Sequence, residues 1–164
     1  MIRHALALIA VLTLASATYG DENSAKLSDA VKSAKVSLET ALRVSEREGK
    51  PISGKYELED GKLQLSVYTV KSTKFYEVII DHTTGKIAKT EEITSGDDLA
   101  AAKEQSAAMA HAKRSLRQAV KDAQKAHKGF RAIGVVPEVR TSHPIATITL
   151  SKERETLTAT EKLD

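Results

Sequence analysis

Apolar and polar residues alternate with period two between residues 52 and 80, which is the pattern of half-buried β-strands. Asp60-Gly61 supplies a tight hairpin turn between the first two runs. The expected strands span residues 52–59, 62–70 and 74–80, with a short fourth at 86–91. One face of this sheet comprises Ile52, Tyr56, Leu58, Leu63, Leu65, Val67, Tyr76, Val78 and Ile80. The first half of the chain therefore predicts a small antiparallel sheet with one buried face.

A helix is predicted immediately before these strands. Ser28 can cap it, and a face with three- and four-residue spacings continues to about Glu48. Gly49 stops the helix, and Pro51 prevents its continuation. The face comprises Val31, Ala34, Leu38, Ala41, Leu42 and Ser45. We expect it to cover the apolar side of the sheet, while residues 18–26 form a flexible lead-in.

The order of helix and strands recurs in the second half. Residues 97–128 favour a single long helix, and Gly129 ends it. The expected strands span residues 130–136, 138–141, 145–150 and 155–161, with a break at Pro137 and turns at 142–144 and 151–154. The offset between the halves is roughly 80 residues, so the chain is predicted to be duplicated. The competing interpretation is that the second half completes a single larger sheet.

The first residues have the pattern of a secretory signal. Arg3 supplies a basic start, residues 5–14 are apolar, and Ala15-Ser16-Ala17 has the small residues that a signal peptidase accepts. We expect cleavage after Ala17, because about ten apolar residues fall well short of the roughly 20 that a membrane-spanning helix needs. No later segment reaches that length, so the mature chain is expected to be periplasmic or secreted.

The composition narrows the compartment and the partner classes. Cysteine is absent, so the chain can hold neither a disulfide nor a lipid-modified cysteine. An exported chain without disulfides relies on packed cores, which favours a bacterial envelope. Loss of Arg3 with the signal lowers the formal charge from +3 to +2, so net charge identifies no partner. Export and the few aromatic residues argue against binding to nucleic acid.

The acidic strand that ends at Asp60-Gly61 and the later turn Asp81-His82-Thr83-Thr84-Gly85 together resemble the PepSY domain family. The resemblance covers about residues 27–93. It implies a helix laid on an antiparallel sheet, a place outside the cytoplasm, and a binding role as a regulator of peptidases or a sensor of the surroundings. The second half is similar to a degenerate PepSY-like unit, because it lacks the Asp-x-x-Thr-Gly turn.

These observations predict an α+β fold of two tandem units, each an α-helix packed on a small antiparallel β-sheet. The expected divisions are a signal peptide at 1–17, the lead-in at 18–26, a PepSY-like domain at 27–93 and a degenerate PepSY-like domain at 94–164.

The sequence contains no set of residues arranged for catalysis. His-Glu-x-x-His, Gly-x-Ser-x-Gly, a phosphate-binding glycine loop and a cysteine nucleophile are all absent. The histidines beyond the signal are scattered, at His82, His111, His127 and His143. Asp81 and Gly85 are interpreted as turn formers, since one carboxylate in a short turn is too few ligands for calcium. We therefore expect no enzymatic activity, no cofactor and no metal.

The far face of the first sheet is a candidate contact surface. Tyr68, Phe75 and Ile79 lie there beside Val70 and Glu77. Four large apolar or aromatic groups are more than a solvent-facing surface needs, so something is expected to cover them. The cover is the second unit or its long helix, a separate protein, or a second copy of the chain. Tyr68, Phe75 and Ile79 are the hypothetical partner contact.

The predicted long helix carries a basic side opposite an apolar stripe. Its cations are Arg114, Arg117, Lys121, Lys125 and Lys128. Such a side is either the solvated face of an amphipathic helix or a contact for anionic lipid or acidic protein. The leading hypothesis is an exported non-enzymatic modulator that binds a peptidase or an envelope sensor, with a homodimer left open. The alternative is an envelope-surface protein that uses the basic side.

Overall fold

The computed structural model describes residues 15–164, which form four helices and seven strands. Most of the expected signal peptide, residues 1–14, lies outside the described residues. The helices are α1 (Ala15–Val31), α2 (Leu38–Ser45), α3 (Gly96–Ala110) and α4 (Leu116–Ala126). The strands are β1 (Lys50–Glu59), β2 (Lys62–Lys71), β3 (Lys74–Ile80), β4 (Ile87–Ile93), β5 (Arg131–Arg140), β6 (His143–Lys152) and β7 (Glu155–Lys162).

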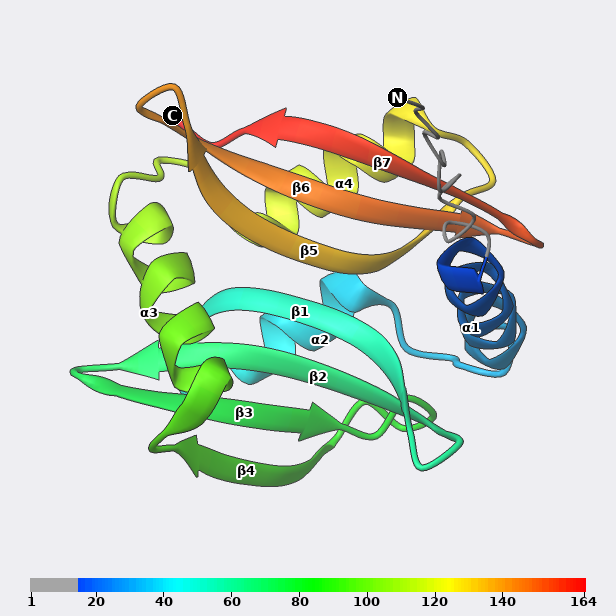
Figure 1. Cartoon of the computed structure of the whole chain (residues 1–164). Helices are drawn as coiled ribbons and strands as arrows, with labels where there is room; N and C mark the ends of the chain where they lie inside the picture. The colour runs from blue at the N-terminus through cyan, green and yellow to red at the C-terminus, as the bar shows by residue number, and fades with distance from the viewer. Residues whose placement is uncertain (1–14) are drawn as a thin grey trace, which may run out of the picture.

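All seven strands belong to one antiparallel sheet in the order β4-β3-β2-β1-β5-β6-β7. Figure 1 shows α3 in front of this sheet and α2 and α4 behind it. The predicted α+β class is therefore confirmed. The strands of the two halves meet edge to edge at β1 and β5, where Gly54 pairs with Val135 and Lys55 pairs with Gly134. The paired residues show that the halves share one sheet through a short junction.

The prediction of one helix from Ser28 to about Glu48 is wrong. Residues 32–37 form a linker that separates α1 from α2. Residues 18–26, expected as a flexible lead-in, lie within α1. Ser28, expected as the helix cap, is buried inside α1, and its Oγ lies 2.8 Å from Oγ of Ser151. The spacing of apolar residues continues across the linker, which is why the pattern did not reveal the break.

Backbone hydrogen bonds fix the linker before α2. Ser37 is the true N-cap, since its Oγ accepts the N–H of Thr40 at 3.1 Å. The N–H groups of Lys35 and Val36 both donate to the carbonyl oxygen of His82, at 2.9 and 3.0 Å. The linker is therefore held against the turn that follows β3.

The prediction of a single helix over residues 97–128 is also wrong, because a linker interrupts it. α3 and α4 are separate, and Ser115 caps α4. The N–H groups of Lys113 and Arg114 donate to the carbonyl oxygen of Leu163, at 2.6 and 3.0 Å. In each half, the linker before the capped helix thus bonds to a carbonyl that follows the third strand.

Strands β1 to β4 lie within a few residues of their predicted bounds, but β5 does not. The expected break at Pro137 is wrong, because Pro137 pairs with Ala146 in the middle of the β5–β6 ladder. Proline lacks an N–H, yet β1 pairs with β5 only at residues 134–135, so no ladder bond is lost on that side. The turns are also shorter than expected, with positive φ at Thr141-Ser142 and at Glu153.

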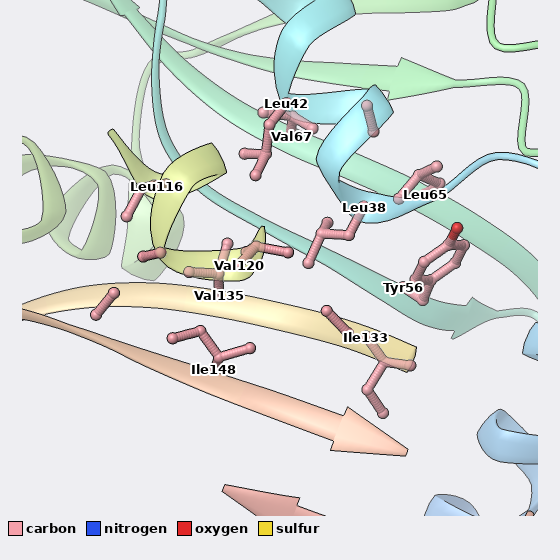
Figure 2. Packing of buried hydrophobic residues seen from close by; sticks show 14 of the residues in the cluster. Leu38, Leu42, Tyr56, Leu65, Val67, Leu116, Val120, Ile133, Val135 and Ile148 are labelled. Atoms are coloured by element: carbon pink, nitrogen blue, oxygen red, sulfur yellow. The ribbon is translucent and has the colours of Figure 1, made fainter. Parts of the chain in front are cut away.

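The main core lies between the sheet and the pair of helices behind it. Of the face expected to be apolar, Leu58, Leu63 and Tyr76 are half-buried and the other members are buried. A Cβ at Gly54 would lie 3.2 Å from Cδ1 of Leu38, so glycine lets α2 approach β1 closely. In Figure 2 the helix residues Leu38, Leu42, Leu116 and Val120 lie over the strand residues Val67, Val135 and Ile148.

Each half also holds a helix of the other half through a basic residue at the start of its first strand. Lys50, which begins β1, donates its Nζ to the carbonyl oxygen of Met109 near the end of α3, at 3.1 Å. Arg131, which begins β5, reaches the end of α1 and the linker after it. Its acceptors are the carbonyl oxygens of Val31, Ala34 and Val36, at 3.1, 2.9 and 2.7 Å, and the hydroxyl of Tyr56 at 3.1 Å.

Candidate functional site

The hypothetical partner contact lies on the front face, which we define as the sheet face that carries Tyr68, Phe75 and Ile79. The three side chains are half-buried and come from β2 and β3. α3 packs on β1, β2 and β5, and Figure 1 shows it in front of the sheet. The first part of the predicted long helix therefore supplies part of the expected cover.

A hollow of about 200 Å³ separates α3 from the sheet beside Tyr68. Ser53 on β1 donates its hydroxyl to Oε1 of Gln105 on α3, at 2.6 Å, which ties the helix to the sheet. The ammonium of Lys55 lies 5.7 Å from the centre of the Tyr68 ring. The lining residues are Ser53, Gly54, Lys55, Tyr68, Asp98, Ala101, Ala102, Gln105 and Val136.

Polar side chains on the front face form a hydrogen-bonded network that begins at Tyr68, beside this hollow. The hydroxyl of Tyr68 lies 3.4 Å from Oε1 of Glu77, and Gln64 contacts both Glu77 and Ser66. Burial, followed by the nearby carboxylates of Glu77 and Glu57, raises the pKa of Tyr68, so its hydroxyl stays protonated and donates. Ser66 donates to Glu57 at 3.3 Å but is fully buried, which keeps its hydroxyl away from a substrate. These contacts hold the polar side chains of Tyr68, Gln64 and Glu77 in place on the front face.

Two exposed valines were missed by the sequence prediction. Val136 and Val139 are 46% and 52% exposed, and both belong to the part of β5 that is not paired with β1. They border a hollow of about 570 Å³ against α3. The expected break at Pro137 hid them, although the β-branched run on both sides of the proline was a signal for one continuous strand.

The predicted basic side does not form one ridge. Arg114 lies in the linker before α4, and its guanidinium donates to the carbonyl oxygen of Lys162 at 2.6 Å and to the carboxylate of Asp122 at 2.5 Å. The Arg114 side chain therefore makes intramolecular contacts that stabilise the fold. The other four members are half-buried or exposed and lie on α4 or just beyond it, namely Arg117, Lys121, Lys125 and Lys128.

Asp81 and Gly85 form a tight turn after β3. One carboxylate oxygen of Asp81 accepts the N–H groups of Thr83 and Thr84, at 2.8 and 2.9 Å. The backbone N–H of Thr84, followed by that of Thr83, lowers the pKa of Asp81. Gly85 takes a φ of +76°, which favours glycine, and its N–H donates to the carbonyl of Asp81.

Over the described residues, no group of three or more histidine, cysteine, aspartate or glutamate side chains could hold a metal ion. His143 lies 2.5 Å from the carboxylate of Asp164 near the C-terminus, and His127 meets the ring of Phe130 edge-on. The described helices include none long and apolar enough to cross a membrane.

Comparison with known proteins gives a family match within the first half of the chain. Residues 35–91 match the model of the PepSY family, described as "Peptidase propeptide and YPEB domain", which confirms the resemblance seen in the sequence. The matched range begins in the linker before α2 and ends in β4. A search of curated proteins gave no match.

One solved structure is similar to this chain, a protein from Clostridium difficile 630 described as "a putative lipoprotein". The two share 18% sequence identity with a TM-score of 0.38, and the match covers 78% of this chain and 95% of that chain.

Proposed function

We infer from the PepSY domain at residues 35–91 that this protein is an exported, non-enzymatic module that binds another protein and modulates it. The partner class that the family description favours is a peptidase, with an envelope sensor as the other choice. The signal pattern of residues 1–17 supports export. The buried Ser66 and the scattered histidines support a role in binding and not in catalysis.

The position of Phe75 and Ile79 next to an open strand edge carries the proposal. Both lie on β3, beside β4, which is the last strand on its side of the sheet. An extended partner segment can add to β4 through main-chain hydrogen bonds and cover the two apolar side chains. Lys89, Glu91 and Glu92 on β4 would discourage indiscriminate pairing of the same edge.

The two phenylalanines of the chain allow a matched test. A photo-crosslinking phenylalanine analogue replaces Phe75 in one variant and Phe130 in another, and each is expressed in the native envelope. We expect position 75 to capture a defined partner and position 130 to capture none. The purified partner should then bind Ile79→Arg at least about tenfold more weakly than the unaltered protein, because a charge replaces an apolar contact. Equal capture at both positions, or equal binding by Ile79→Arg, contradicts the proposal.

A second candidate function uses the exposed cations of α4. Lys121 and Lys125 are solvent-exposed on this helix, which suits contact with an anionic membrane surface. Co-sedimentation with anionic vesicles should then fall steeply with salt and fall further in Lys121→Glu/Lys125→Glu. Strand pairing at β4 should be nearly insensitive to salt, so this measurement separates the two functions.

We further propose that residues 27–93 and 94–164 are two tandem units and that the second is a degenerate PepSY-like copy. The capping serines Ser37 and Ser115 and the corresponding bonds of the two linkers support this division. The junction of β1 with β5 also supports this division. Gly54 pairs with Val135 and Lys55 pairs with Gly134, so the two members of each pair lie about 80 residues apart, which is the offset between the proposed units.

A further inference from the structure

We propose that a hollow between the end of α2, the start of α4 and the linker before α4 binds a small amphiphile with one anionic head group and an apolar tail. The hollow has a volume of about 350 Å³, which is at the small end of the range for small-molecule pockets. Tyr68, Phe75 and Ile79 do not line it, so this site is independent of the proposed partner contact. Its apolar lining comprises Leu42, Pro51, Met109, Ala112 and Leu116.

Comparison of the two halves explains why this hollow is open. Val31 and Met109 occupy corresponding places, six residues before the capping serines Ser37 and Ser115. In the first half, the guanidinium of Arg131 fills the space beside this position and bonds to three carbonyl oxygens. In the second half, the corresponding residue is Lys50, whose ammonium bonds, among residues 15–164, only to the carbonyl of Met109. The smaller head group leaves the space beside it empty of protein atoms.

The charges around the hollow select an anion. Lys50, Lys113, Arg114 and Arg117 line it, against the single carboxylate of Glu46. Arg114 is already bonded to Asp122 and the backbone of Lys162. Lys113 is exposed and Arg117 half-buried, and neither makes an ion pair with the described part of the chain. These two side chains are therefore available to hold an anionic head group, at the positive end of the α4 dipole.

The apolar floor defines the rest of the ligand. Leu42 from α2 and Leu116 from α4 both line the hollow, and Met109 and Ala112 continue the apolar surface toward α3. A short alkyl chain fits this floor, while the volume is too small for a folded partner. A free medium-chain carboxylate combines the required head and tail, and we take octanoate as its probe.

Met109 provides a local readout, because the only other methionine of the chain is Met1. With methyl-labelled methionine, octanoate should shift the NMR signal of Met109 in a saturable manner. Octyltrimethylammonium, which has a cationic head on the same tail, should not. Lys113→Ala/Arg117→Ala should weaken octanoate binding by about tenfold or more, since two charge-assisted contacts are lost. The matched control, Lys121→Ala/Lys125→Ala, removes the same charge from α4 outside the hollow and should bind octanoate normally.

Lys50→Arg tests the structural explanation directly, because it keeps the charge and supplies the head group that closes the equivalent space in the first half. We expect it to abolish the octanoate shift while the protein stays folded by circular dichroism. Ala112→Leu fills the hollow from the opposite side and replaces this test if Lys50→Arg does not fold. An unmoved Met109 signal, an equal shift with the cationic amphiphile, or equal weakening by the control pair overturns the proposal.

Discussion

In the first half of the molecule, Arg131 makes four hydrogen bonds, to the last carbonyl of α1, to two carbonyls of the linker before α2 and to the hydroxyl of Tyr56. In the second half, Lys50 makes one hydrogen bond to the described residues, to a carbonyl near the end of α3. The backbone layout around both positions is the same, with a serine cap and a linker bonded to a carbonyl after the third strand. The difference shows that backbone hydrogen bonds set the layout. The basic side chain at the start of the first strand then sets how many carbonyl oxygens are bonded at that position.

The largest effect is expected from the shared core. Leu38 and Leu116 each follow a capping serine and are fully buried. Replacement of either with alanine should lower the free energy of unfolding by about 3 kcal/mol, through lost apolar contacts and the cavity left behind. Because α2 packs against α4, urea denaturation should show one transition for the whole chain in both variants. Two separate transitions would mean that the halves fold independently.

Replacement of the two basic residues with alanine should destabilise the protein to different extents. Arg131→Ala leaves several partly buried carbonyl oxygens without their donor, so we expect a loss of about 3 kcal/mol in unfolding free energy. Lys50→Ala removes one hydrogen bond and should cost only about 1 kcal/mol. Urea midpoints at constant slope measure both values. Similar losses from the two variants would contradict the proposal that Arg131 fills the space beside it while Lys50 leaves its space open.

The junction glycines offer a finer comparison. A Cβ at Gly54 would crowd Cδ1 of Leu38 at 3.2 Å, so Gly54→Ala should destabilise the protein by about 1 to 2 kcal/mol. A Cβ at Gly134 would meet Thr149 only at an ordinary 3.8 Å, so Gly134→Ala should change stability by no more than about 0.5 kcal/mol. Thermal unfolding of the two variants tests this difference. Equal destabilisation would show that the junction itself, and not α2, requires glycine.

The smallest effect concerns the turn that only the first half possesses. The pKa of Asp81 is lowered in the folded state by the N–H groups of Thr84 and Thr83. Its contribution to stability is therefore full above the unfolded-state pKa of about 3.9 and is lost as the pH falls through the lower folded-state pKa. The stability difference between the unaltered protein and Asp81→Ala should be larger at pH 7 than at pH 3 in urea denaturation. A difference that does not change with pH would exclude the carboxylate as its cause.

The sequence predicted those features whose cause is local. Alternation at residues 52–80 placed the first strands and their buried face, and the spacing of Asp81 and Gly85 identified a turn. The far-face residues Tyr68, Phe75 and Ile79 were also assigned correctly to one side of the sheet. Their cover was not predicted in detail, because the position of α3 depends on where its helix ends.

Both helix breaks escaped prediction because their cause is distant in the chain. The N–H groups of Lys35 and Lys113 find their acceptors at His82 and Leu163, far along the sequence. Neither bond leaves a trace in the local spacing of apolar residues. The same limit hid the exposed part of β5, since the absence of β1 beside Pro137 is what makes a proline acceptable there.

By itself, the sequence determined the alternating strands, the turn chemistry, the resemblance of the first half to the PepSY family, whose model matches residues 35–91, and the α+β class. Only the tertiary structure decided that the halves join at β1 and β5, that Arg131 bonds to the linker after α1, and that Lys50 bonds to the end of α3. The physical reason is the range of the interactions. Period, capping and turns act between residues a few positions apart, whereas strand junctions and carbonyl acceptors join residues that only folding brings together.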